Sequence, residues 1–188
     1  MTIDVLFIHS AGSQFGDDGS APFVKKLRAS LGQNFNVNAP LMPLPDDPSY
    51  DRWRNKLKEL LQHKSPPVLI GHSLGGSVLL KYISEEQPAI SSVGLFLVAT
   101  PFWGDENWNS DEFVLRENVA NFLPDTLNIF LYQSRDDDVV SIDHLTRYSS
   151  AIPRAAVNEL DGGGHVFKNG LPCLVEDIQR LAEKLELK

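Results

Sequence analysis

The sequence predicts an α/β protein, a three-layer α/β/α sandwich with a mainly parallel sheet of about six strands. Short apolar runs such as 5–8, 68–70 and 93–98 are typical of strands that are buried on both faces of a parallel sheet. Amphipathic segments separate these runs along the chain. Strands that alternate with helices are typical of a parallel sheet with helices on both faces.

In the first third of the chain, short local patterns indicate where each element begins and ends. Ser20 is a candidate N-cap of a helix with Pro22 in its first turn, and Gly32 ends that helix. Four prolines hold an extended loop at 40–48, and Ser49 can cap a second helix. The expected elements are a strand at 4–9, a helix from about 20 to 31, a strand at 36–39, and a helix that carries Trp53, Leu57, Leu60 and Leu61 on one face.

The rest of the chain continues the alternation, with one irregular region at 101–124. That region is rich in aromatic residues among acidic ones, and we expect either a small lid at 102–124 or a minor hydrophobic cluster under a loop. The expected elements are strands at 68–70, 93–98, 127–132 and 155–160, and helices at 78–83, 142–150 and 174–187.

Length and charge narrow the classes of partner. The 188 residues suit one domain, 1–188. A net charge of −8 argues against nucleic acid or an anionic membrane as a partner, because both need a basic surface. Neither a signal peptide nor a membrane span is predicted, so we expect a cytoplasmic protein. No cofactor and no metal are expected, a protein partner is unknown, and the single cysteine, Cys173, is interpreted as a packing residue.

The pattern Gly71-His72-Ser73-Leu74-Gly75 stands between an apolar strand and an amphipathic helix. A G-x-S-x-G pattern in that context predicts a nucleophile elbow. The turn holds its central serine in a strained conformation and exposes the hydroxyl at a helix N-terminus, where developing negative charge is favoured. We expect that only glycine fits at positions 71 and 75, because the neighbouring backbone passes too close to these positions for a side chain.

A serine hydroxyl needs a base, and His165 is the predicted base. It follows the last strand in a glycine-rich loop, after Ser73 and the aspartates in chain order, as expected on this kind of sheet. The remaining histidines have structural interpretations: His9 as a packing residue, His63 at a helix end, His72 inside the elbow and pointing away from the solvent side of Ser73, and His144 on a surface helix.

The acid that orients the base is expected among Asp136, Asp137 and Asp138, which follow the fifth strand. Asp137 is the first choice because an apolar residue three places on can anchor the loop, and Asp136 is the second. Three adjacent aspartates are also common in solvated turns, and a metal site lacks a second cluster of ligands.

The oxyanion hole requires two donors aimed at the developing negative charge. One is expected to be the backbone N–H of Leu74, directly after the nucleophile, and the other the N–H of Ala11 in the loop after the first strand. Candidate substrate-binding residues are Ser10, Phe102, Trp103 and Trp108.

Taken together, these residues resemble the α/β-hydrolase superfamily, and within it the small single-domain serine hydrolases of the YdeN and retinoblastoma-binding-protein-9 type. The resemblance spans nearly the whole chain and rests on five segments: residues 7–11, the proline-rich loop before Trp53, the elbow at 71–76, Asp136-Asp137, and Gly163-Gly164-His165. It implies a triad of Ser73, Asp137 and His165. The chain is short for the superfamily, and we expect it to lack the first two strands of the full sheet and any large cap. Ser10 and Ser141 depart from the family pattern, in which Gly and Pro are usual.

The leading functional hypothesis is therefore a serine hydrolase, or esterase, that cleaves a small carboxylic ester through an acyl-enzyme intermediate. One alternative keeps the nucleophile for acyl-thioester cleavage or acyl transfer. The other is a protein-binding module with little or no turnover on a hydrolase scaffold.

Overall fold

The computed structural model describes residues 2–62 and 66–186. His63, which we expected at a helix end, lies outside the described residues. All six strands form one parallel sheet in the order β2-β1-β3-β4-β5-β6, which confirms the predicted fold class. The strands are β1 (Ile3–Ile8), β2 (Phe35–Asn38), β3 (Val68–His72), β4 (Gly94–Val98), β5 (Asn128–Ser134) and β6 (Ala156–Leu160).

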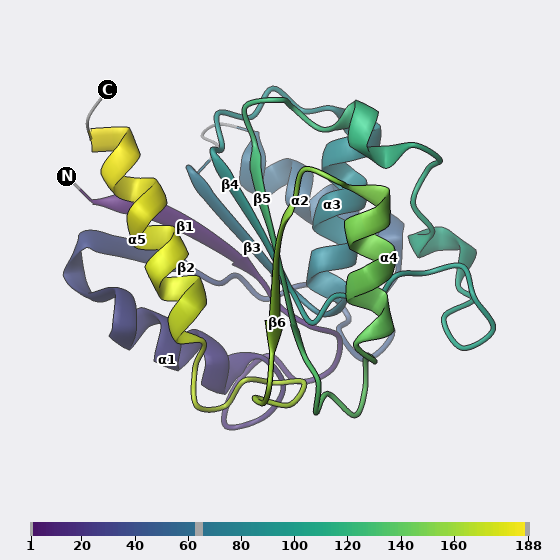
Figure 1. The fold of residues 1–188 in the computed structure, drawn as a ribbon, viewed down its shortest axis with the longest axis horizontal. Coiled ribbons are helices and arrows are strands. Elements are labelled where there is room, and N and C mark those ends of the chain that lie inside the picture. Colours follow the sequence, from purple (N-terminus) through teal and green to yellow (C-terminus); the bar gives the residue numbers. More distant parts are fainter. Residues whose placement is uncertain (1, 63–65, 187–188) are drawn as a thin grey trace.

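Helices cover both faces of this sheet (Figure 1). One face is packed by α1 (Ala21–Leu31) and α5 (Pro172–Glu186), and the other by α2 (Tyr50–Leu61), α3 (Leu74–Glu86) and α4 (Asp143–Ala151). The four central strands, β1, β3, β4 and β5, place side chains in both layers because successive residues point to opposite faces. In β1, residues 3, 5 and 7 pack toward α1 and α5, whereas 6 and 8 pack toward α2 and α3. Burial on both faces explains why β1, β3 and β4 are nearly continuous apolar runs.

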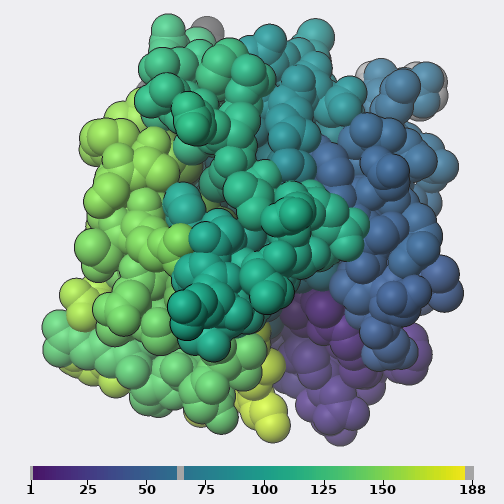
Figure 2. All heavy atoms as spheres, turned by 90° about the vertical axis from the view of Figure 1, so that its right-hand side faces the viewer, coloured from purple at the N-terminus to yellow at the C-terminus, as the bar shows by residue number. Residues whose placement is uncertain are grey.

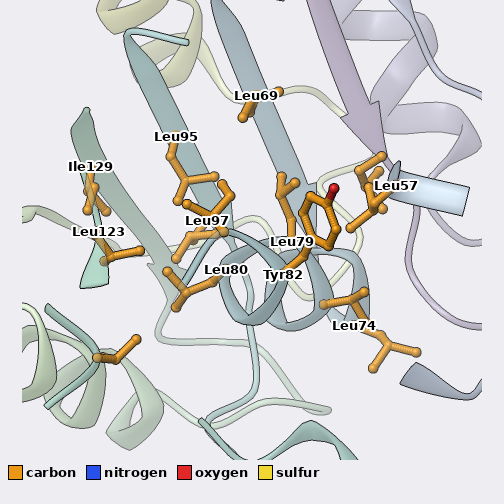
Figure 3. Packing of buried hydrophobic residues seen from close by; sticks show 14 of the residues in the cluster. Leu57, Leu69, Leu74, Leu79, Leu80, Tyr82, Leu95, Leu97, Leu123 and Ile129 are labelled. Atoms are coloured by element: carbon orange, nitrogen blue, oxygen red, sulfur yellow. The ribbon is translucent and has the colours of Figure 1, made fainter. Parts of the chain in front are cut away.

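Helix α3 is the most buried helix, because every described residue from Leu74 to Ser84 is buried. Figure 3 shows its side chains Leu79 and Leu80 against Leu95 and Leu97 of β4. A helix that is enclosed all round is mostly apolar, and the polar residues that α3 buries are hydrogen-bonded: Ser77 to the Pro101 carbonyl, Lys81 to the Val114 carbonyl and Ser84 to the Lys81 carbonyl. This packing fixes the helix that begins directly after Ser73, so the position of the serine is set by the core.

Segment 101–124 runs over α3 and contains two short 3₁₀ turns, η2 (Asp111–Phe113) and η3 (Val119–Phe122). In Figure 2 it covers the centre of one face, between α4 on the left and α2 on the right. Its buried residues Phe113 and Val119 belong to the same apolar cluster as α3. Within the described part of the chain, no helix is long and apolar enough to cross a membrane.

Three sequence-based expectations are wrong in detail. Ser49 stands at the N-cap of α2, but its side chain makes no capping hydrogen bond. Ser20 stands at the start of α1, but its side chain makes no capping hydrogen bond. Its hydroxyl oxygen instead accepts the Ser10 N–H at 2.8 Å, because that buried N–H in the loop after β1 needs an acceptor. His144 is not on the surface: it is buried, and its Nδ1 accepts the Phe102 N–H at 2.8 Å, which ties α4 to segment 101–124.

Candidate active site

The turn between β3 and α3 holds Ser73 in a conformation that side chains rarely adopt, with φ +52° and ψ −123°. The Ser73 N–H donates to the Val98 carbonyl at 2.8 Å, which anchors the turn to β4. Close backbone contacts explain the glycines on either side. A Cβ on Gly71 would lie 2.4 Å from the Gly76 Cα, and one on Gly75 would lie 2.4 Å from the Ile8 and His9 carbonyl oxygens. The strained turn is therefore enforced by tight packing.

Because all strands are parallel, their carboxyl ends meet at one edge of the sheet, and three of the predicted site residues lie together there. His165 Nε2 lies 3.0 Å from Ser73 Oγ. The other ring nitrogen, Nδ1, lies 2.9 Å from Asp137 Oδ2 and 3.1 Å from Oδ1. The Asp137 carboxylate is fully buried as a side chain, while the His165 ring is 11% exposed.

The surroundings of Asp137 determine the tautomer of His165. Its Oδ1 accepts the N–H groups of Val139 and Val140 at 2.9 and 2.8 Å, and its Oδ2 accepts Gln133 Nε2 at 2.7 Å. Burial alone would raise the pKa of the Asp137 carboxyl, but His165 and the N–H groups of Val140 and Val139 hold that pKa below its usual value. An ionised carboxylate only accepts hydrogen bonds, so Nδ1 carries the proton and the lone pair of Nε2 faces Ser73.

Asp136, the alternative acid, does not reach His165. Its carboxylate accepts the Ser134 hydroxyl and the N–H groups of Gly163 and Gly164, the last at 2.8 Å. Asp136 lies in the turn that follows β5, and its carboxylate faces the glycine-rich loop, whereas the Asp137 carboxylate faces the imidazole. Asp136 instead holds the glycine-rich loop that carries His165.

His72 supports the same loop from below. It is completely buried, and its Nε2 donates to the His165 carbonyl oxygen at 2.8 Å, as the acceptor requires. Its ring lies 5.1 Å from the His165 ring. Burial, and then the neighbouring His165, lowers the pKa of His72 to about 3. Burial also lowers the pKa values of His9 and His144, and these rings pack against Phe7 and Trp108.

We expect the stability of the fold to fall as the pH drops through the acid range, partly because of His72. In the unfolded chain this ring binds a proton below about pH 6.5, whereas in the folded chain it stays neutral down to about pH 3. Protons therefore favour the unfolded state across that window, by up to about 1.4 kcal/mol per pH unit. Urea unfolding of the wild type and of His72→Gln between about pH 6 and pH 4 measures this, and an equal slope in both proteins would contradict it.

The two predicted oxyanion donors lie at the same cavity as Ser73, since Ala11 and Leu74 both line it. Within residues 2–62 and 66–186, neither backbone N–H donates to a protein acceptor. The loop that carries Ala11 is held by the bond of Ser10 to Ser20 and by Gly12 N–H, which donates to the Pro45 carbonyl at 2.8 Å. Both donors therefore belong to anchored backbone.

A cavity of about 350 Å³ opens at Ser73 and His165. Of the predicted substrate-binding residues, Ser10, Trp103 and Trp108 line it. Phe102 does not: its ring packs against Tyr148 at 4.9 Å and beneath the Arg147 guanidinium at 4.6 Å. Among the lining residues that the sequence analysis did not place at the site are Gly19, Pro48, Pro101, Val139 and Val166. These residues come from separate loops, and their residue types do not indicate a binding role. The sequence offers one weak signal, which is that Val139 directly follows the three aspartates; the structure leaves its side chain exposed.

A strained serine turn between a strand and a helix of a mostly parallel sheet, with a histidine within reach of that serine, is typical of the α/β hydrolases. The chain belongs to the serine hydrolase family, whose model matches residues 16–172. It is a hydrolase of this class. No curated protein matches the chain.

Several solved structures share the fold. The ydeN gene product of B. subtilis is 21% identical, with a TM-score of 0.75 over 97% of this chain and 100% of that one. A putative YdeN-like hydrolase from Pectobacterium atrosepticum is 15% identical, with a TM-score of 0.70 over 97% and 92% of the two chains. Est1E from Butyrivibrio proteoclasticus is 13% identical, with a TM-score of 0.71 over 100% and 89%.

Proposed function

We propose that this protein hydrolyses a small carboxylic ester with Ser73 as nucleophile, His165 as general base and Asp137 as the group that orients the base. The observation that carries the proposal is the continuous chain of hydrogen bonds from Asp137 through both nitrogens of His165 to Ser73 Oγ. A serine hydroxyl becomes a useful nucleophile only when a positioned base takes its proton, and this arrangement supplies that base in the required tautomer.

The reaction follows from the positions of these groups. Ser73 Oγ attacks the ester carbonyl carbon while its proton passes to His165 Nε2, and the N–H groups of Leu74 and Ala11 face the oxyanion that forms. The C–O bond to the alcohol breaks as the imidazolium returns the proton to the departing oxygen. Water then attacks the acyl-enzyme with His165 again as base, which releases the carboxylic acid and frees Ser73.

Buried Asp137 stabilises the imidazolium at both steps, since an ionised carboxylate within hydrogen-bond reach favours the charged ring. The same nucleophile can also accept an acyl group from a thioester, so ester and thioester substrates differ here only in the leaving group. A binding module without turnover would not need Ser73 in a strained turn next to a base.

A fluorophosphonate probe tests the proposal directly. We expect it to label the wild-type protein at Ser73, with the adduct found by mass spectrometry on the peptide that carries this residue, and we expect Ser73→Ala to remain unlabelled. Ser84→Ala is the matched control, because Ser84 is a buried serine of the same helix whose hydroxyl only donates to the Lys81 carbonyl. Labelling that survives in Ser73→Ala would refute the proposal. A panel of esters and thioesters then separates hydrolysis of the two classes from a purely binding role.

A further inference from the structure

The cavity at Ser73 is lined almost entirely by apolar groups. Apart from the indole N–H groups of Trp103 and Trp108, its polar side-chain groups are those of Ser10, Ser73 and His165, and the Ser10 hydroxyl already contacts Ser20 Oγ at 2.8 Å. None of the described lining residues is Lys, Arg, Asp or Glu. A charged substrate group would therefore lose hydration here without gaining an ion partner. Such a lining is unfavourable for charged groups.

Three aromatic rings form one wall of this cavity. Trp103 lies at their centre: its ring is 5.0 Å from that of Trp108 and nearly perpendicular to it, at 86°. On another side its ring is 4.8 Å from that of Phe113, at 40°. All three residues line the cavity. Rings that meet at such angles present both faces and edges, and aromatic pairs prefer offset or edge-to-face contacts.

The central ring of this wall is fixed relative to the nucleophile. Trp103 Nε1 donates to Ser77 Oγ at 2.9 Å, and Ser77 lies one helical turn after Ser73 on α3. The Ser77 hydroxyl in turn donates to the Pro101 carbonyl at 3.0 Å, which also accepts the Tyr148 hydroxyl at 2.9 Å. Ser77 and Tyr148 are buried and their hydroxyl groups are hydrogen-bonded, so the acceptor that holds the partly buried indole is fixed before substrate binds.

We propose that the cavity selects an uncharged aromatic ring carried by one half of the ester, and that Trp103 is the residue that determines this specificity. The inference rests on the proposed function of Ser73 and names its substrate class. An added ring gains contacts with the wall beyond what burial of an alkyl chain provides. The preorganised indole lets those contacts form without a rearrangement.

Carbon-matched esters test the proposal. Methyl 3-phenylpropanoate is compared with methyl nonanoate for the acyl half, and 2-phenylethyl acetate with octyl acetate for the alcohol half. In at least one pair we expect kcat/KM to be about five- to tenfold higher for the phenyl ester, after division by the alkaline hydrolysis rates. The monomethyl ester of nonanedioic acid, which carries a carboxylate, is expected to react roughly 100-fold more slowly than methyl nonanoate.

Trp103→Leu is expected to abolish the phenyl preference, and Trp103→Phe to retain part of it. Phe102→Leu is the matched control: it alters the adjacent aromatic residue, which packs outside the cavity, and should keep the wild-type ratio. A phenyl preference of one or less in both pairs, or one that persists in Trp103→Leu, would overturn the inference.

A measurement on the wild type alone keeps the inference testable even if the variants do not fold. We expect 2-phenylethylboronic acid to protect Ser73 from the fluorophosphonate probe at about five- to tenfold lower concentration than octylboronic acid. Absence of labelling without any inhibitor would overturn the proposed function. Normal labelling with no preference between the two boronic acids would overturn only the aromatic specificity.

Discussion

Asp137→Asn is expected to lower kcat by about 10⁴-fold, the size of loss that this change causes in serine protease triads. Oδ1 of Asp137 accepts two backbone N–H groups, so the amide oxygen of asparagine must take that place. The amide NH₂ then replaces Oδ2, where it faces the donors Gln133 Nε2 and His165 Nδ1. The imidazole is forced to carry its proton on Nε2, toward Ser73, and can no longer act as a base.

Steady-state ester hydrolysis and the rate of fluorophosphonate labelling measure this loss. Asp136→Asn is the matched control: the amide oxygen can keep the hydrogen bonds from the Ser134 hydroxyl and the Gly164 N–H at Oδ1, and the amide NH₂ loses only the 3.3 Å bond from the Gly163 N–H. We expect it to retain activity within about tenfold of the wild type. The reverse pattern, with Asp136→Asn inactive and Asp137→Asn active, would show that the orienting acid is misassigned.

Gly75→Val is expected to prevent folding. A Cβ at this position would lie 2.4 Å from two backbone carbonyl oxygens of the chain that leaves β1, and backbone in the central sheet cannot move aside. The branched side chain adds further overlap in the same space. We expect a loss of more than about 4 kcal/mol, a large part of the stability of a domain this size. Circular dichroism and soluble yield of the purified variant measure the effect.

Gly162→Ala is the control for this substitution. Its Cβ would meet only Asp136 Oδ2, at 3.5 Å, which is an ordinary contact, and its backbone does not have the positive φ that favours glycine. We expect its midpoint of thermal unfolding to stay within a few degrees of the wild type. A folded and active Gly75→Val would show that β1 does not pass the turn as closely as described.

Much of the fold follows from local patterns that any reader of the sequence can find. The apolar runs of β1, β3 and β4 are continuous because the sheet is covered on both faces, and this burial leaves a direct mark on composition. The ends of elements were less predictable by a few residues: β5, for example, continues to Ser134, beyond the predicted end at 132. Strand ends depend on pairing with a neighbour, here β6, which local sequence does not record.

The candidate site, like the fold, could be predicted from the sequence only in part. Glycines at 71 and 75, a serine between them and a histidine in a glycine-rich loop are recognisable because the turn and the loop need those residue types. The sequence analysis missed the burial of His144. The apolar spacing of the helix does not show that segment 101–124 packs against α4, where the Phe102 N–H donates to the His144 ring.

The sequence by itself determined the order of strands and helices and which residues are candidates for the site, because periodicity and turn chemistry act over a few neighbouring residues. Only the tertiary structure decided which of two adjacent aspartates faces His165, that the Ser20 hydroxyl serves Ser10 rather than its helix, and which side chains form the cavity wall. Those outcomes depend on loops that are distant in the chain and meet only when parallel strands align their carboxyl ends.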